Sequence, residues 1–348
     1  MRFLRALTTF IGVTESNTSA TRSLSQSTMP SSPSSSTNFD KKSTKQVISE
    51  RNPEIGFSQS ITCEPILVKQ SKFQKIEIHR SQHYGKILVL DGVVQLTEKD
   101  ACSYNEMLTH VPLMQHKNPK RVLIIGGGDG YVLKEVLKHA SVEHVDHVEL
   151  DGEVVEVCKE HFSCGEAFDD SRVKLHIQDG KDFVEDAPDN FYDVIIQDSS
   201  DPFAYDDETG GKFSLPSDVL YSRRHFAEMN RILSDGGIFN FQGETFNIPS
   251  DLEGIQTWRK QALDVGFSTV RYGSIYITSY IGGQIGFLMC EKEKNDDTQT
   301  SIESVQSRFE QIEKTTGGTL YYQPLLQSSC FALPLWVHKS IYCDGEKD

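Results

Sequence analysis

The sequence lacks a paired-cysteine motif, a long apolar run and an excess of basic residues. Its seven cysteines are scattered and odd in number, and no Cys-x-x-Cys pair occurs. This pattern disfavours a disulfide scaffold or a structural zinc site, and it favours a reducing compartment such as the cytoplasm. No apolar run approaches the roughly 20 residues that span a membrane. We therefore expect a cytoplasmic protein with no metal site and no membrane partner.

The charge balance narrows the choice of partner. The formal net charge is −15 at pH 7. A general nucleic-acid-binding protein would normally present a basic face, so nucleic acid is not an expected partner. The acidic balance is compatible with a cationic ligand, although many enzymes are equally acidic. With 348 residues, 37% of them hydrophobic, the chain can form a substantial core and two domains.

The N-terminal segment 1–48 has a composition of its own. It is rich in Ser and Thr and begins MRFLRALTTF. Two interpretations stay open, an organelle transit segment or a disordered tail that is not cleaved. In either case the segment is not expected to contribute to the fold.

Residues 49–115 are predicted to form a small N-terminal β domain. Apolar residues alternate or cluster in three runs that turn-like groups separate, at 61–68, 73–79 and 86–90. Such runs are typical of strands. An amphipathic helix is expected at 103–113.

Residues 116–348 are predicted to form a larger catalytic domain in which strands and helices alternate. Strands are expected at 121–125, 145–150, 173–177, 193–197 and 238–242, and helices at 131–139, 152–162 and 222–233. This rhythm predicts an α/β fold with a doubly wound parallel sheet. The polar segment 293–317 is expected to be an exposed helix or a linker.

A glycine-rich turn, GGGDG at 126–130, follows the first strand of this domain directly. Glycine lets the backbone turn sharply and approach a ligand closely. The turn does not complete the Gly-x-Gly-x-x-Gly pattern, because the sixth position is Tyr131 or Leu133, and it is not a P-loop. The acid Asp129 disfavours a pyrophosphate and favours a ligand with an adenosine and a cationic tail.

Two further strand ends carry acids. Glu149 ends the second strand, where an acid can bind both hydroxyls of a ribose, although it could also cap a helix. Asp179-Gly180 ends the third strand, where a loop typically meets a purine ring, although Asp-Gly is also a common turn.

The fourth strand ends in the sequence DSSDP, which contains Asp198 and Asp201. Ligands bind beyond the carboxyl ends of parallel strands, so both acids can point into one cleft. One carboxylate could take a proton from an ammonium nucleophile while the other holds a second cationic nitrogen. An Asx-type turn before the proline would explain Asp201 alone.

Taken in order, these motifs resemble those of the spermidine synthase family of polyamine aminopropyltransferases. The segments that carry the resemblance are KILVLDGVVQLTEKD (86–100), SYNEMLTHVPL (103–113), NPKRVLIIGGGDGYVLKEVLKH (118–139), YDVIIQDSSDP (192–202), FQGE (241–244) and YIGGQIGFLMC (280–290). The resemblance implies a small N-terminal β domain, a Rossmann-like, class I methyltransferase-like catalytic domain, and a homodimer.

The resemblance also implies a reaction and a set of site residues. An aminopropyl group would pass from decarboxylated S-adenosylmethionine to putrescine, with release of methylthioadenosine, so the donor is a co-substrate and no cofactor is expected. Asp198 would be the general base. The donor would bind Gln74, Asn105, Asp129, Glu149, Asp179 and Gly180. The polyamine acceptor would contact Tyr104, Asp198, Asp201 and Tyr280.

Several segments depart from the family pattern beside the predicted acceptor pocket. Residues 203–218 replace a shorter loop, contain the acid cluster Asp206-Asp207-Glu208, and are predicted to form a mobile lid. Residues 278–284 and 326–329 also differ. Two alternatives therefore stay open, a longer amine as acceptor, as in a spermine synthase, or a catalytically weak paralogue with a regulatory role.

Overall fold

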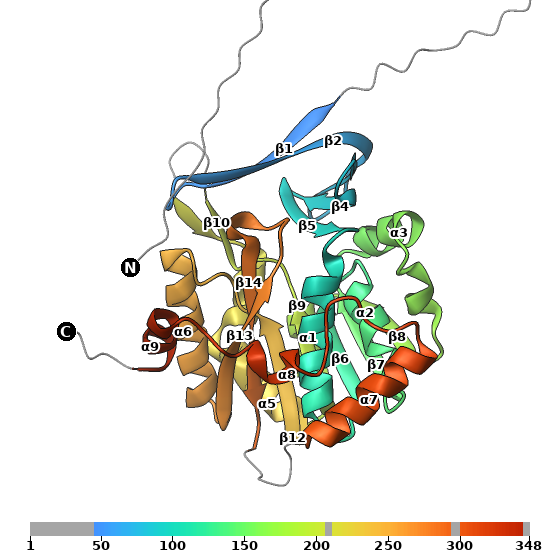
Figure 1. The fold of residues 1–348 in the computed structure, drawn as a ribbon, viewed down its shortest axis with the longest axis vertical. Helices are drawn as coiled ribbons and strands as arrows, with labels where there is room; N and C mark the ends of the chain where they lie inside the picture. Colours follow the sequence, from blue (N-terminus) through green and yellow to red (C-terminus); the bar gives the residue numbers. More distant parts are fainter. Residues whose placement is uncertain (1–44, 206–210, 294–299, 344–348) are drawn as a thin grey trace, which may run out of the picture. The chain divides into compact units, whose positions relative to one another are not determined.

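Five antiparallel strands form the first sheet, in the order in which they occur along the chain (Figure 1). The computed structural model describes residues 45–205, 211–293 and 300–343. The strands are β1 (Gln46–Asn52), β2 (Phe57–Gln70), β3 (Lys75–Ser81), β4 (Gly85–Leu90) and β5 (Val93–Thr97). The three predicted strands correspond to β2, β3 and β4. The strand β1 begins inside the segment 1–48, so the expectation that this whole segment does not contribute to the fold is wrong for its last residues.

Sequence reasoning missed β1 and β5 for different reasons. The strand β1 is polar and mostly exposed, so it lacks a core-facing apolar pattern. The strand β5 is short and follows β4 after a tight turn at Asp91 and Gly92, whose φ angles are 48° and 88°. Positive φ at both central residues is typical of a hairpin turn that matches the twist of the strands.

Seven strands form the second sheet, in the order β13-β14-β12-β9-β6-β7-β8. Their bounds are β6 (Arg121–Gly126), β7 (His144–Glu149), β8 (Val173–Ile177), β9 (Tyr192–Asp198), β12 (Leu233–Gln242), β13 (Thr269–Tyr276) and β14 (Gln284–Glu291). The pairs that join β12, β9, β6, β7 and β8 are parallel, whereas those that join β13, β14 and β12 are antiparallel. The predicted doubly wound parallel sheet is confirmed, and the sheet carries two further antiparallel strands at one edge.

Two layers of helices cover the parallel strands. One layer contains α1 (Ala101–Gln115), α2 (Tyr131–Val136) and α7 (Ile302–Thr315), and the other α4 (Gly180–Asp186), α5 (Arg223–Ile232), α6 (Pro249–Asp264) and α9 (Leu335–Tyr342) (Figure 1). Alternate strand residues face the two layers: Ile124 and Ile196 pack in the first core, and Ile125 and Ile195 in the second. This alternation follows from the two-residue period of a strand.

The helix α3 (Gly152–His161) links the two sheets. Its residues Val154, Val157 and Cys158 pack in one core with Ile76 and Leu88 of the first sheet. The three-residue spacing from Val154 to Val157 presents these side chains on one face of the helix. The small sheet is thereby held close to the carboxyl end of β7.

The topology creates a switch point between β6 and β9. The chain leaves β6 toward β7 and β8 on one side, and it returns to β9 on the other side. Gly126 at the end of β6 is paired with Asp198 at the end of β9. Since crevices form where the strand order reverses, the fold brings the glycine turn and the acidic loop to the expected ligand position.

Three other segments differ in detail from the prediction. The helix expected at 131–139 already ends at Val136, and the segment 293–317 contains α7. Part of 203–218 forms the hairpin β10 (Phe203–Tyr205) and β11 (Lys212–Ser214), followed by the 3-10 turn η2 (Pro216–Tyr221). The acid cluster at 206–208 lies outside the described residues, as does most of the segment 1–48. Within the described part of the chain, no helix is long and apolar enough to cross a membrane.

Candidate active site

The glycine turn is held tightly against the end of β9. The amide of Gly127 donates a 2.8 Å hydrogen bond to the carbonyl oxygen of Asp198. A Cβ atom at Gly126 would lie 2.2 Å from that carbonyl oxygen, and one at Gly128 would lie 2.9 Å from Oε2 of Glu149. Glycine is therefore required where the ends of β6, β7 and β9 approach one another.

The carboxylate of Asp198 lies between this turn and the helix α1. Its Oδ1 accepts a 2.8 Å hydrogen bond from the hydroxyl of Tyr104. Its Oδ2 would lie 3.0 Å from a Cβ atom at Gly127. Burial, and then the negative charge of Asp129, raise the pKa of Asp198 to about 7. A carboxyl group with a pKa near neutrality is suited to accept a proton during a reaction.

Two other predicted acids lie half-buried beside Asp198. Burial raises the pKa of Asp129 to about 6, and its Oδ1 accepts a 2.8 Å hydrogen bond from the amide of Tyr131. Burial raises the pKa of Glu149 to about 7, and its Oε1 accepts a 2.8 Å hydrogen bond from the amide of Asp151. A cationic ligand would lower the pKa values of these acids, because a nearby positive charge favours the carboxylate form.

Gln74 reaches the same site from the first sheet. Its Nε2 donates a 3.2 Å hydrogen bond to Oδ2 of Asp151, which also accepts a 2.6 Å hydrogen bond from the hydroxyl of Ser71. Because the amide of Asp151 in turn donates to Glu149, Gln74 lies one residue removed from the predicted ribose-binding acid. The structure thus brings together two residues that are far apart in the sequence.

Asn105 is 2% exposed and lies on α1 next to Tyr104. Its Nδ2 donates a 2.9 Å hydrogen bond to the carbonyl oxygen of Ala101. Its Oδ1 has no hydrogen-bond partner among the described residues. A buried acceptor without a partner is costly, and within the described part of the chain no residue supplies a donor to this oxygen.

Asp179 and Gly180 have distinct roles at the start of α4. Asp179 is exposed and caps the helix, since its Oδ1 accepts a 2.8 Å hydrogen bond from the amide of Lys181. A Cβ atom at Gly180 would lie 2.8 Å from Cγ2 of Ile125. The glycine therefore allows α4 to begin close to the end of β6, near the glycine turn.

The loop around Tyr280 is fixed to the first sheet and to the start of α1. The hydroxyl of Tyr280 donates a 2.6 Å hydrogen bond to the carbonyl oxygen of Gln95. Asp100 accepts hydrogen bonds from Thr278 and from the amide of Ser279, of 2.8 and 2.9 Å. The ring of Tyr280 consequently lies 6.3 Å from that of Tyr104, on the Asp198 side of the site.

Asp201 belongs to an acidic group that sequence reasoning did not identify as part of the site. Its Oδ1 accepts a 2.7 Å hydrogen bond from Nε2 of Gln242. Glu244 is 8% exposed, and burial and then the charge of Asp201 raise its pKa well above the usual range. The segment FQGE (241–244) could have identified Gln242 and Glu244 as site residues, because it stands at the end of β12, which pairs with β9.

Two further acids approach the same group from other elements. Burial raises the pKa of Glu50, on β1, to about 7, and the charge of Asp201 contributes to the shift. Burial and the charge of Asp201 raise the pKa of Asp251, on α6, to about 8. Neither residue stands in a motif with a strand-end signal, so only the tertiary structure identifies them.

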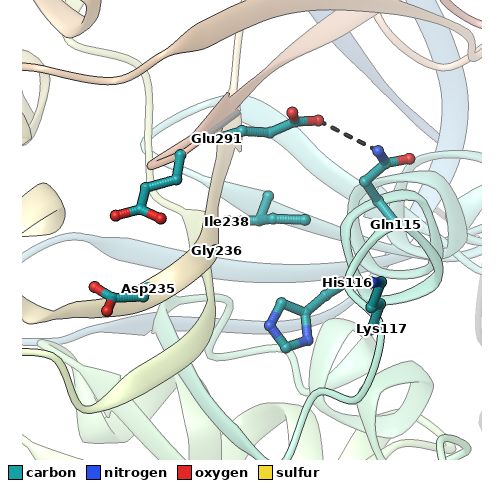
Figure 2. A pocket seen from close by; sticks show the side chains of 8 residues that line it. Gln115, His116, Lys117, Asp235, Gly236, Ile238 and Glu291 are labelled. Atoms are coloured by element: carbon teal, nitrogen blue, oxygen red, sulfur yellow. Dashed lines mark hydrogen bonds between the residues drawn. The ribbon is translucent and has the colours of Figure 1, made fainter. Parts of the chain in front are cut away.

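A cavity of about 200 Å³ lies at the opposite end of the large sheet, where β12 begins and β14 ends (Figure 2). In it, Nε2 of Gln115 donates a 3.4 Å hydrogen bond to Oε1 of Glu291. Its lining residues are Gln115, His116, Lys117, Asp235, Gly236, Ile238, Glu291 and Glu293. None of the predicted site residues lines this cavity, and those that end the parallel strands lie at the other end of the sheet, so this cavity is not part of the candidate active site.

Comparison with known proteins identifies the family. The family described as the spermine/spermidine synthase domain matches residues 101–300, and the spermidine synthase tetramerisation domain matches residues 46–98. Spermidine synthase 2 of Arabidopsis thaliana is 37% identical over 288 residues, which cover 82% of this chain and 81% of that protein. Spermidine synthase 1 of Hyoscyamus niger is 36% identical over 294 residues, which cover 84% of this chain and 89% of that protein.

A solved structure has the same fold. The crystal structure of a spermidine synthase in complex with the transition state analogue AdoDATO matches with a TM-score of 0.73 and 30% sequence identity, and the match covers 85% of this chain and 94% of that chain. The tetramerisation domain indicates that the chain forms oligomers. The similarity extends over both sheets and the site between them, and this chain therefore belongs to the spermidine synthase family of aminopropyltransferases.

Proposed function

We propose that this chain transfers the aminopropyl group of decarboxylated S-adenosylmethionine to putrescine and releases methylthioadenosine. The observation that carries the proposal is the environment of Asp198. Its two carboxylate oxygens lie against Tyr104 and the glycine turn, and burial raises its pKa to about 7. A base of this kind can keep an attacking amine unprotonated near neutral pH.

On the donor side, each predicted residue has a chemical reason for its role. Asp129 would pair with the ammonium of the aminopropyl group, because a buried carboxylate is stabilised by a nearby cation. Glu149 would accept hydrogen bonds from the ribose hydroxyls, with Gln74 beside it. Asn105 would accept a further hydrogen bond through its buried Oδ1. Asp179 and Gly180 would border the adenine, at the start of α4.

The reaction is a displacement at the methylene carbon next to the sulfonium. The lone pair of the acceptor amine forms a new C–N bond, the C–S bond breaks, and its electron pair neutralises the sulfur. The proton lost by the amine passes to Asp198. Since the positively charged sulfur is itself a good leaving group, the proposed reaction requires neither a metal nor a prosthetic group. Alignment of the amine with the methylene supplies much of the rate.

On the acceptor side, Tyr104, Asp201 and Tyr280 would position the amine. A longer acceptor such as spermidine is the second candidate, and one observation favours it. The acids Glu244, Asp251 and Glu50 lie close enough to Asp201 for its charge to raise their pKa values, so carboxyl groups that an ammonium group would ionise are available beyond the position of the first distal ammonium. An additional ammonium group could be paired there.

The oligomeric state and the cellular location of the chain are also proposals. We expect at least a homodimer, with the small N-terminal sheet contributing to the contact between copies. The cytoplasmic location expected from the cysteine pattern stays a proposal. Sedimentation of the full chain and imaging of a C-terminal fluorescent fusion would test these two points separately.

A product assay on the full chain tests the proposed function. Decarboxylated S-adenosylmethionine is supplied with putrescine, with spermidine or with no amine, and the products are read by mass spectrometry. Spermidine formed from putrescine would support the leading proposal, whereas a tetraamine formed only from spermidine would favour the longer acceptor. No product with either amine, despite donor binding, would favour a regulatory paralogue.

A further inference from the structure

A buried histidine lies beneath the glycine turn and has no role in the reaction proposed above. His147 is on β7, two residues before Glu149, and is 0% exposed. Its Nε2 lies 2.7 Å from the carbonyl oxygen of Gly126. A carbonyl oxygen can only accept a hydrogen bond, so Nε2 carries the proton. Burial lowers the pKa of His147 to about 4, so the ring is neutral at pH 7 and donates through Nε2 alone.

This hydrogen bond completes the restraint on a single peptide group. The carbonyl of Gly126 accepts from His147, and the amide of Gly127 in the same peptide donates to the carbonyl oxygen of Asp198. A peptide group is planar, so contacts at its two ends fix its orientation. Both glycines have positive φ, 79° and 64°, and lack side chains that could restrain the turn locally. His147 therefore supplies a restraint that the turn itself lacks.

Neighbouring side chains hold His147 in this position. Its ring stacks on that of Phe168, with the ring centroids 5.4 Å apart and an angle of 15° between the planes. Phe168 also lies under the turn, since a Cβ atom at Gly130 would be 2.5 Å from its Cε2. The thiol of Cys164 donates a hydrogen bond to the carbonyl oxygen of Asp129. The backbone of the turn is thus contacted by His147 of β7, by Phe168 of η1 (Gly165–Asp169), and by Cys164, which precedes η1.

We propose that His147 is a positioning residue for donor binding, which acts by holding the peptide that joins the glycine turn to the backbone of Asp198. This inference rests on the proposed function, because that proposal gives the turn its ligand. Without the hydrogen bond, the Gly126–Gly127 peptide is held only at its amide end, and Asp129 shifts relative to Glu149. The donor should then bind less well, whereas the acceptor contacts of Tyr280 and Asp201 are unaffected.

Two substitutions separate the hydrogen bond from the packing of the ring. His147→Phe keeps an aromatic ring against Phe168 and removes the donor, whereas His147→Gln keeps an N–H group at a similar reach. His144→Gln is the matched control, because His144 is on the same strand and its Nε2 contacts Asp146 instead of the turn. The dissociation constant of methylthioadenosine, the KM values of donor and acceptor, and the melting temperature are measured for each full-length variant.

We expect His147→Phe to weaken methylthioadenosine binding and to raise the donor KM by about tenfold, the scale of one buried hydrogen bond, with the acceptor KM unchanged. His147→Gln should restore most of the affinity, and His144→Gln should bind like the unmodified chain. If His147→Phe does not fold, the smaller His147→Val removes the same donor and enters the same comparison.

A lower melting temperature with unchanged methylthioadenosine binding would overturn the proposal, because His147 would then be only structural. Equal changes in the donor and acceptor KM values would also overturn it. Failure of the proposed function would look different, since the unmodified chain would then form no spermidine from putrescine, whereas the effect of His147→Phe is read from methylthioadenosine binding.

Discussion

The hydroxyl of Tyr104 donates a 2.8 Å hydrogen bond to Oδ1 of Asp198. Tyr104 is on α1 and Asp198 ends β9, so the contact forms only when the helix packs against the carboxyl end of the sheet. The hydrogen bond lowers the pKa of Asp198, while burial and the charge of Asp129 raise it to about 7. The pKa of the proposed base is therefore set by opposing effects: the hydroxyl of Tyr104 lowers it, and burial and the charge of Asp129 raise it.

Replacing Asp198 tests the base directly. Asp198→Asn keeps the shape of the side chain but cannot accept the proton, so we expect turnover to fall by about 10²-fold or more. Methylthioadenosine binding should be retained, which calorimetry would check alongside steady-state kinetics. Asp235→Asn, at the opposite end of the sheet, is the control and should keep full turnover. Full turnover by Asp198→Asn would remove this residue from the mechanism.

Replacing Tyr104 tests the hydrogen bond to the base. Tyr104→Phe removes a donor that stabilises the carboxylate, so the pKa of Asp198 should rise and the acidic limb of the kcat/KM profile should move to higher pH. A displacement of about one pH unit corresponds to a hydrogen bond of ordinary strength. Tyr322→Phe, whose hydroxyl contacts Gln327, is the control. If the acidic limb of the kcat/KM profile of Tyr104→Phe stays at the same pH, the hydrogen bond of Tyr104 does not set the pKa of Asp198.

Replacing Asp129 tests how the donor is recognised. Asp129→Asn can still accept the hydrogen bond from the amide of Tyr131 but loses its negative charge. We expect weaker binding of decarboxylated S-adenosylmethionine, by about tenfold for a lost charge-assisted contact, and unchanged binding of methylthioadenosine, which has no ammonium. Both affinities are measured by calorimetry. Equal losses for the two ligands would mean that Asp129 does not contact the ammonium.

Acids whose pKa values are raised in the fold make stability depend on pH. Burial raises the pKa values of Asp198, Glu149 and Glu50 to about 7 and that of Asp251 to about 8. In the unfolded chain these carboxyls titrate near pH 4. The folded chain therefore binds more protons from about pH 4 to about pH 8, and the free energy of unfolding should fall as pH rises through this window, with the last part of the fall above pH 7. Histidines whose pKa values burial lowers, such as His147 and His225, oppose this fall only up to about pH 7, because in the unfolded chain they titrate near pH 6.5.

Thermal unfolding of the unliganded chain between pH 7 and 8.5 checks this sign. Asp251→Asn should flatten the slope by up to about 1.4 kcal/mol per pH unit, the value for one proton. Asp186→Asn, on the surface of α4, should leave the slope unchanged. A melting temperature that rises between pH 7 and 8.5 would show that the acids are paired in the free protein.

The ends of the parallel strands could be predicted because each is marked by a short stretch of neighbouring residues. Apolar β-branched runs mark β6, β7, β8 and β9, and the residues that follow each run must lie at one edge of a parallel sheet. The sequence alone therefore assigns Asp129, Glu149 and Asp198 to one site. The strand β1 could not be predicted, because its exposed, polar pattern satisfies no periodic template.

Other parts of the site depend on contacts that no local pattern records. Gln242 ends β12 and Glu244 follows it, but their link to Asp201 requires β12 to lie next to β9. His147 has the appearance of an ordinary residue inside a strand, and its role depends on the position of the Gly126 carbonyl.

The local sequence accounts for the strand ends of this protein, because it places glycines where the backbone must turn and acids at the ends of parallel strands. The packed structure is needed to find the pKa values of those acids, the tyrosine that reaches Asp198, and the residues that hold the glycine turn in place. These two kinds of feature differ because they depend on residues at different separations along the chain. Backbone conformation follows from neighbouring residues, whereas burial and charge coupling depend on residues that are distant in the chain and become close only when the two sheets and their helices pack together.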